Sequence, residues 1–243
     1  MRVPTTSFQN AFGKYLKLAI EGEDIIITKN GNGVAKMTSY QDPLLYIMKE
    51  GAAEYYVRKR VSYSEFCEIV ENSESQYELI DGELYMMSSP RHEHQAAFRD
   101  IFIDMCQFFK GKPCEVLSAP FDVMLYNDAE SFEDDPNVVQ PDILVLCDPE
   151  TINDKGIYHG IPTLVVEILS PSTRTKDMIK KLSLYMLSGV CEYWIVDTEQ
   201  EKVHIYSFQE RKIKDLKTIP FTQCIESDYF EGLKVNLPKS TTE

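Results

Sequence analysis

Two short runs of the chain are almost wholly apolar, and each carries a single acid. Residues 141–147 read Pro-Asp-Ile-Leu-Val-Leu-Cys, and residues 163–169 read Thr-Leu-Val-Val-Glu-Ile-Leu. Runs of this length that are rich in Val, Ile and Leu predict buried strands. The acids are Asp142 and Glu167. An acid at a buried strand position loses its hydration unless a partner compensates it.

Each of these acids, taken alone, has a structural explanation. Asp142 follows a proline and could begin a turn, and Glu167 could pair with a basic side chain. Together they are separated by 25 residues, which leaves room for one strand, a connection and a second strand. The combination favours a bound cation, and Mg²⁺ suits carboxylate and carbonyl oxygens.

The pattern around the two acidic runs predicts a mixed α/β body. From residue 92 onward the predicted order is helix, three strands, helix, strand, which indicates helices packed on a central sheet. The predicted elements are a short helix at 62–71, a hairpin at 77–87 that turns at Asp81-Gly82, helices at 92–109 and 175–188, and strands at 114–126, 141–147, 163–169, 192–197 and 202–208.

The first 60 residues have a different pattern and a different charge. A helix is predicted at 6–20, two strands at 24–28 and 34–38 flank a turn, and a helix or helix pair is predicted at 41–60. This segment carries nine Lys and Arg against six Asp and Glu, whereas the remainder carries sixteen against thirty-three. We therefore expect one domain at 1–60 and a second at 61–243.

The net charge of −14 limits the range of partners. A strongly acidic body repels polyanions at long range and argues against coating of nucleic acid without regard to sequence. A local basic groove or a phosphate bridged by a metal ion stays compatible with this charge. No apolar stretch reaches the length of a membrane span, and the N-terminus has no signal-peptide pattern, so no membrane partner is expected.

The six cysteines contain no Cys-x-x-Cys pair, so neither a zinc site nor a dithiol redox motif is indicated. Cys106 and Cys147 fall within apolar runs and are expected to be small buried hydrophobic residues. A cytoplasmic, reducing location fits this pattern best.

The N-terminal segment resembles the Phd/YefM antitoxin family over residues 1–40. The resemblance is carried by Gly13-Lys14-Tyr15-Leu16 and by Ile25-Ile26-Ile27-Thr28-Lys29-Asn30-Gly31. It implies a homodimer formed through this segment, DNA contact from the N-terminal face of the dimer, and a possible toxin partner. Candidates for DNA contact are Arg2, Asn10 and Lys14; the alternative is that they are solvated residues of a dimerisation module. Gln9 stands where many relatives carry an arginine.

Residues 62–235 resemble the Uma family of restriction endonucleases in the PD-(D/E)XK superfamily, whose αβββαβ core matches the predicted order of elements. Several ordered motifs carry this resemblance. They are Glu78-Leu79-Ile80-Asp81-Gly82-Glu83, His94-Gln95, Pro141-Asp142, Val166 to Thr173, Lys181, Tyr185, Gly189-Val190 and Glu192 to Asp197.

The resemblance implies a metal-dependent enzyme that cleaves phosphodiester bonds. Asp142 and Glu167 would bind Mg²⁺ or Mn²⁺, and the backbone carbonyl of Ile168 would complete the protein's contribution. The ion would neutralise charge on the phosphate and lower the pKa of a bound water. A lysine would position the attacking water or help to deprotonate it.

The chain departs from the superfamily pattern at that lysine, because the position two residues after Glu167 is Leu169. Lys180 and Lys181 on the following helix are the candidates to replace it. Helical geometry places Lys181 beside the face that packs on the sheet, and Lys180 almost opposite. Lys181 also follows Asp177 by four residues, so the two can pair. Lys181 is the predicted site lysine, and Lys180 is expected to be solvated.

Among the histidines, only His94 has a context that suggests a role in the site. It begins the apolar face of its helix, where a core position is the alternative, and the family motif favours the site. His92, His159 and His204 are expected to have no catalytic role.

Other polar residues near these motifs have simpler explanations. Glu78 and Glu83 are expected on the hairpin surface, with the alternative that Glu78 points into the cleft. Residues 170–173 could contact a phosphate or cap the next helix. Trp194 is expected in the core.

The leading hypothesis is a metal-dependent DNA endonuclease fused to an antitoxin-like module. The alternative is a regulator, binding DNA or neutralising a toxin, whose nuclease fold is inactive; it is suggested by the N-terminal segment and by Leu169. A nuclease for RNA or branched intermediates has less support, because no RNA-binding motif is recognised.

Overall fold

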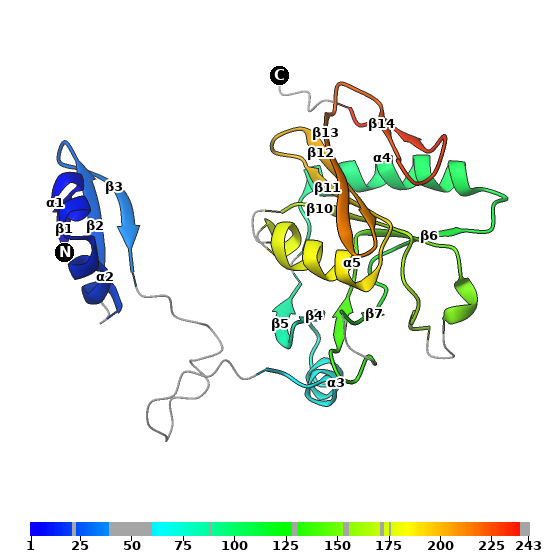
Figure 1. Cartoon of the computed structure of the whole chain (residues 1–243), viewed down its shortest axis with the longest axis horizontal. Coiled ribbons are helices and arrows are strands. Elements are labelled where there is room, and N and C mark those ends of the chain that lie inside the picture. Colours follow the sequence, from blue (N-terminus) through cyan, green and yellow to red (C-terminus); the bar gives the residue numbers. More distant parts are fainter. Residues whose placement is uncertain are drawn as a thin grey trace. The chain divides into compact units, whose positions relative to one another are not determined.

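The structure is a computed structural model that describes residues 1–20, 23–38, 60–87, 89–127, 131–152, 156–170, 173–174 and 176–238. The chain divides into two compact units, Met1–Lys59 and Arg60–Glu243 (Figure 1). The helix or helix pair predicted at 41–60 lies almost entirely outside the described residues. Within the described ranges, none of the helices combines the length and apolar composition needed to cross a bilayer.

The described residues of the first unit form a three-stranded sheet and two short helices. Strand β2 (Ile25–Lys29) lies between β1 (Arg2–Pro4), which is parallel to it, and β3 (Asn32–Met37), which is antiparallel. The helices are α1 (Thr5–Asn10) and α2 (Phe12–Ile20), so the single helix predicted at 6–20 is interrupted at Ala11. Its small core gathers around Val3, Ala19 and Ile25. The assignment of this unit as antitoxin-like stays a prediction.

The second unit is built on a six-stranded mixed sheet in the order β13-β12-β11-β10-β9-β6. Strand β10 is antiparallel to β9 and parallel to β11, because helix α5 makes a crossover between β10 and β11. The bounds are β6 (Glu115–Ser118), β9 (Ile143–Leu146), β10 (Leu164–Ile168), β11 (Glu192–Asp197), β12 (Lys202–Gln209) and β13 (Lys212–Pro220), with α4 (His92–Phe109) and α5 (Leu182–Ser188). The predicted αβββαβ order is therefore confirmed as α4, β6, β9, β10, α5 and β11.

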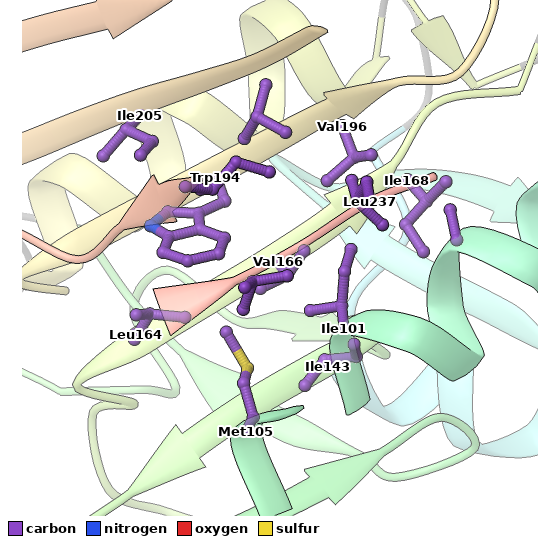
Figure 2. Packing of buried hydrophobic residues seen from close by; sticks show 14 of the residues in the cluster. Ile101, Met105, Ile143, Leu164, Val166, Ile168, Trp194, Val196, Ile205 and Leu237 are labelled. Atoms are coloured by element: carbon purple, nitrogen blue, oxygen red, sulfur yellow. The ribbon is translucent and has the colours of Figure 1, made fainter. Parts of the chain in front are cut away.

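The two faces of this sheet bury different helices. Along β10 the alternate residues Leu164, Val166 and Ile168 pack with α4, as Figure 2 shows for Ile101 and Met105. The residues between them face α5 and Tyr185. Trp194 lies in the α4 layer and is fully buried, which confirms the core position predicted for it. Glu167 is therefore on the α5 side of the sheet, since side chains alternate along a strand.

A second sheet of four strands, in the order β5-β4-β8-β7, lies in the same unit. The β4–β5 hairpin turns at Asp81 and Gly82, both with positive φ, as the Asp-Gly pair predicts. Helix α3 begins after Ser62, whose hydroxyl and the Glu65 carboxylate form a capping box. The bounds are α3 (Tyr63–Glu71), β4 (Tyr77–Ile80), β5 (Glu83–Met86), β7 (Val123–Leu125) and β8 (Asn137–Val139).

The prediction of a single strand at 114–126 is wrong, because this segment supplies strands to both sheets. Strand β6 ends at Ser118, and β7 begins at Val123 in the other sheet. Pro120 lies between them and has no N–H to continue a ladder. The unit also contains the 3₁₀ turn η2 (Pro149–Thr151) and the strand pair β14 (Ile225–Glu226) and β15 (Lys234–Val235), which covers part of the α4 layer.

Two predictions about the cysteines are also wrong. Cys106 is exposed, because it lies on the outer face of α4. Cys147 is exposed and forms a disulfide with Cys114, which joins the ends of the neighbouring strands β6 and β9. The predicted cytoplasmic location stays a prediction.

Candidate functional site

A cleft of about 610 Å³ opens where β9 and β10 meet α4, β4 and the helical turn before α5. That turn is η3 (Lys176–Lys181), a π-helix. The four residues predicted to be catalytic all line this cleft. Its charged lining includes Glu78, His94, Asp142, Glu167, Asp177 and Lys181.

The pairing of β9 with β10 brings the two predicted metal ligands together. Val166 pairs with Ile143, so the same antiparallel register, extended by one residue, sets Asp142 opposite Glu167. The backbone N–H of Ile168 donates to Oδ2 of Asp142 at 2.7 Å. Residues opposite each other in an antiparallel pair have Cβ atoms roughly 5 Å apart. Asp142 and Glu167 therefore share one end of the sheet.

Glu167 is buried, with 4% of its surface exposed, and is held on one carboxylate oxygen. Its Oε1 accepts hydrogen bonds from Lys181 Nζ at 2.6 Å and from the Tyr185 hydroxyl at 2.7 Å. Burial raises the pKa of Glu167 to about 8; Lys181 opposes this shift, and the other cleft carboxylates add to it. A nearby cation would favour the charged form of this side chain.

Lys181 is the cationic centre of the cleft and is only 2% exposed. Its Nζ lies 2.6 Å from Glu167, 2.8 Å from Glu78 and 3.9 Å from Asp177. Burial disfavours its charge, but these three carboxylates outweigh burial and raise the pKa of Lys181 well above its ordinary value. Lys180 points elsewhere and pairs with Glu83 at 2.8 Å. The structure therefore brings Lys181, and not Lys180, to Glu167.

Glu78 was predicted to lie on the hairpin surface. It is instead completely buried in the cleft wall. The side chain of β4 at this position turns inward, where Lys176 and Lys181 both pair with it and the N–H of Gln140 donates to it at 2.9 Å. Burial raises the pKa of Glu78, but the two lysines outweigh it, and the net shift is downward. Glu83 lies at the half-buried edge of the same hairpin.

His94 contacts Asp142 from the first turn of α4. A hydrogen bond of 3.1 Å joins its Nε2 to Oδ2 of Asp142, and its Nδ1 is buried without a hydrogen-bond partner. Burial disfavours the protonated ring, but the Asp142 carboxylate and then Asp177 outweigh it and raise the pKa of His94. His94 can therefore orient Asp142 and hold a proton beside it.

The remaining site candidates lie outside this set of contacts. The hydroxyls of Ser170 and Thr173 bond to each other at 3.1 Å, and the Thr173 carbonyl accepts from Asp177 N, as in a cap at the start of a helix. Arg2 and Lys14 are exposed in the first unit, and the side chain of Asn10 is not among the side chains that the structure describes.

The donor atoms of the cleft fit a hard divalent cation. Among the described residues, no three His, Cys, Asp or Glu side chains are placed to hold a metal ion by themselves. Mg²⁺, however, commonly uses one or two carboxylates and completes its shell with water and substrate phosphate. The carboxylates of Asp142 and Glu167, with the Ile168 carbonyl beside them, provide such an incomplete set of oxygen ligands.

The charge balance of the cleft supports the same fit. If the four carboxylates that make these contacts are all ionised, they exceed the two ammonium groups by two charges, and a protonated His94 offsets one of them. Burial opposes this state at Glu167, whose pKa is raised to about 8, so a bound cation would favour its charged form. Buried charge of this kind requires compensation. Oδ1 of Asp177 is also buried without a hydrogen-bond partner. The four acids are Glu78, Asp142, Glu167 and Asp177, and the two lysines are Lys176 and Lys181.

Sequence reasoning missed Lys176 and misplaced Glu78. The signal for Glu78 was present, because Tyr77-Glu78-Leu79-Ile80 is a short apolar run with one acid, like the runs that carry Asp142 and Glu167. Lys176 had no such signal, since a lysine near the start of a helix is ordinarily solvated.

Comparisons with known proteins agree with this architecture. The model of the Uma2 family, described as "Putative restriction endonuclease", matches residues 62–238. The uncharacterized protein slr1290 of Synechocystis is 26% identical over 148 residues, which is 60% of this chain and 74% of that protein. The crystal structure of a "putative nuclease belonging to DUF820" from Anabaena variabilis superposes with a TM-score of 0.56 at 17% identity, over 70% of this chain and 90% of that one. The last likeness concerns the fold, and it confirms the predicted fold class.

Proposed function

Because the chain belongs to the Uma2 family, whose description is "Putative restriction endonuclease", we propose that it is a metal-dependent endonuclease that hydrolyses phosphodiester bonds in DNA. The observation that carries the proposal is the contact of Lys181 with Glu167, beside Asp142, in a cleft lined with oxygen atoms that can bind a metal ion. A carboxylate pair and a lysine are the groups that this chemistry requires.

In this proposal Asp142, Glu167 and the Ile168 carbonyl hold Mg²⁺ or Mn²⁺. When bound, such an ion neutralises charge on the phosphate and lowers the pKa of a coordinated water. His94 orients the Asp142 carboxylate through its Nε2, and the Ile168 N–H donates to the same oxygen. Preorganised ligands of this kind reduce the reorganisation that the reaction requires.

Lys181 acts as a fixed cation rather than as a base. Three carboxylates lie within 4 Å of its Nζ and keep the proton there. The N–H that Glu78 and Glu167 do not occupy can donate to a phosphate oxygen and stabilise charge that develops during attack. The loss of the superfamily lysine to Leu169 is compensated by a lysine that reaches Glu167 from the next helix.

The first unit is proposed to bring the nuclease to DNA. Arg2, Asn10 and Lys14 are the proposed DNA contacts, and the resemblance of this segment to antitoxins suggests a homodimer. A dimer would set two cleavage sites at a fixed separation on a duplex. A toxin partner for this unit follows from the same resemblance.

Nicking of supercoiled plasmid tests the proposal. The full chain should convert the plasmid to open circles with Mg²⁺ or Mn²⁺ and not with excess EDTA. The double variant Asp142→Ala, Glu167→Ala should leave it supercoiled. Equal inactivity of the wild type and the double variant, across several metals and substrates, would contradict the proposal.

The second candidate function is a regulator with an inactive nuclease fold. It is favoured by Leu169, which is buried among apolar residues where the superfamily carries its lysine. A gel-shift experiment on DNA upstream of its own gene separates the two functions. Binding without cleavage by the full chain would support the regulator.

A further inference from the structure

Ion pairs from two glutamates join the β4–β5 hairpin to the turn η3, and they differ in burial. Glu83 pairs with Lys180 at the edge, where the side chains are 26% and 30% exposed. Glu78 pairs with Lys176 and Lys181, and its side chain is 0% exposed. Exposed pairs contribute little, whereas a buried charge has to be matched by its surroundings. Attachment of the hairpin to the turn therefore does not explain why the ion pairs of Glu78 are buried.

Glu78 comes from outside the αβββαβ core but reaches the centre of the site. Strand β4 belongs to the four-stranded sheet, where Leu79 pairs with Val138 of β8. The chain then runs from β8 through Gln140, whose N–H donates to Oε1 of Glu78, to Asp142. The carboxylate of Glu78 is thus fixed to the segment that carries a proposed metal ligand.

The same carboxylate competes with Glu167 for one ammonium group. Lys181 Nζ lies 2.8 Å from Oε1 of Glu78 and 2.6 Å from Oε1 of Glu167. If Glu78 lost its charge, Glu167 would be the one remaining close partner of Lys181 among the described residues, with Asp177 at 3.9 Å, and a cation would have to displace a stronger ion pair to reach the Glu167 carboxylate. A partner that shares the lysine weakens this competition.

We propose that Glu78 is a positioning residue, which shares the Lys181 ammonium group with Glu167 and so weakens the ion pair that a divalent cation has to displace at the Glu167 carboxylate. This inference rests on the proposed metal-dependent function and adds a residue that acts through the lysine. Residues of this kind, one contact removed from a ligand, typically change metal affinity by about 10- to 100-fold when they are replaced.

The test is Mn²⁺ binding by the full chain, measured from the electron paramagnetic resonance signal of free Mn²⁺. Glu78→Gln should raise the Kd for Mn²⁺ by about tenfold or more. Glu83→Gln removes the edge pair of the same hairpin, and Glu74→Gln removes an exposed acid from the cleft lining. Both controls should stay within about twofold of the wild type, because exposed charges are screened.

A second variant separates positioning from a general loss of charge or structure. Glu78→Gln combined with Lys181→Met removes one charge of each sign and ends the competition at Glu167. Its affinity for Mn²⁺ should return to within about threefold of the wild type, since coupled residues are not additive. Recovery of this kind is not expected if Glu78 only supports the fold.

Four results would overturn the inference. Glu78→Gln with wild-type affinity would do so, as would a double variant as weak as the single one. If Glu78→Gln does not fold, as judged by circular dichroism, Glu78→Asp replaces it with the same expected direction, and unchanged affinity again contradicts the inference. A wild type that binds no Mn²⁺ would overturn the metal site of the proposed function and this inference with it.

Discussion

Lys181 Nζ lies 2.6 Å from Oε1 of Glu167, although the lysine belongs to a helical turn and the glutamate to a buried strand. The turn η3 begins the crossover from β10 to the parallel strand β11, so it starts close to the end of β10 that carries Glu167. The turn is a π-helix in which Lys181 is buried, and π-helical turns are frequent at functional sites. The crossover can therefore supply a lysine that the strand itself lacks.

The second donor to Glu167 gives a stability prediction. Tyr185→Phe removes the hydroxyl that donates to Oε1 at 2.7 Å and leaves a buried acceptor with one donor fewer. The free energy of unfolding, measured with urea, should fall by about 1–2 kcal/mol. Tyr206→Phe is the control, because no hydrogen bond is described for its hydroxyl, and it should change stability by less than about 0.5 kcal/mol. Equal effects of the two changes would show that the bond to Glu167 contributes nothing.

The fold was predictable where local chemistry and periodicity agree. The α4 helix, the strands β9, β10 and β11, and the turn at Asp81-Gly82 lie where the pattern of apolar and turn residues predicts them. The edge strand β13 was not predicted, because its alternating Lys and apolar residues are exposed and give no signal of burial. The division of residues 114–126 between two sheets depends on tertiary packing, so the periodicity of the strand does not predict it.

The ion pair at the end of β11 gives a prediction about pH. Burial disfavours the Asp197 carboxylate, but the Arg174 guanidinium at 2.7 Å outweighs it and lowers the pKa of Asp197. A lowered pKa in the folded state stabilises the protein above the unfolded value near 3.9, and this stabilisation is lost as the pH falls through the folded pKa.

Asp197→Asn should therefore lower the free energy of unfolding by about 1 kcal/mol at pH 7, a value reduced because Arg174 is partly exposed. The difference from the wild type should shrink only below about pH 4. Urea denaturation at several pH values measures it, with the exposed neighbour Glu199→Gln as control. A difference that stays constant or grows as the pH falls is incompatible with this account.

The disulfide between Cys114 and Cys147 closes a loop with a sequence separation of 33. The unfolded protein should expose four reactive thiols without reductant and six with it, because the other four cysteines are free. Cys147→Ser should lower the stability by about 3 kcal/mol under oxidising conditions. Cys106→Ser, which changes an exposed free thiol, should have little effect. Six reactive thiols in the untreated wild type would contradict the bridge.

The candidate site was predictable in part. Asp142 and Glu167 were identifiable because a charge in an apolar strand needs a partner, and Lys181 because helical geometry separates it from Lys180. The inward direction of Glu78 depends on how the hairpin packs against η3, through residues far apart in the sequence. Such a contact is set by tertiary structure, and neither the hairpin pattern nor the turn chemistry contains it.

The most direct test of the central claim, that Asp142 and Glu167 form the metal site of a nuclease, is the initial rate of Mg²⁺-dependent plasmid nicking by single isosteric variants. Asp142→Asn and Glu167→Gln should each reduce the rate by about 10²-fold or more, because each removes the charge of a ligand while keeping its shape. The control is Glu93→Gln, which changes an exposed residue next to His94 and should leave the rate unchanged. Nicking by either ligand variant at the wild-type rate would contradict the account.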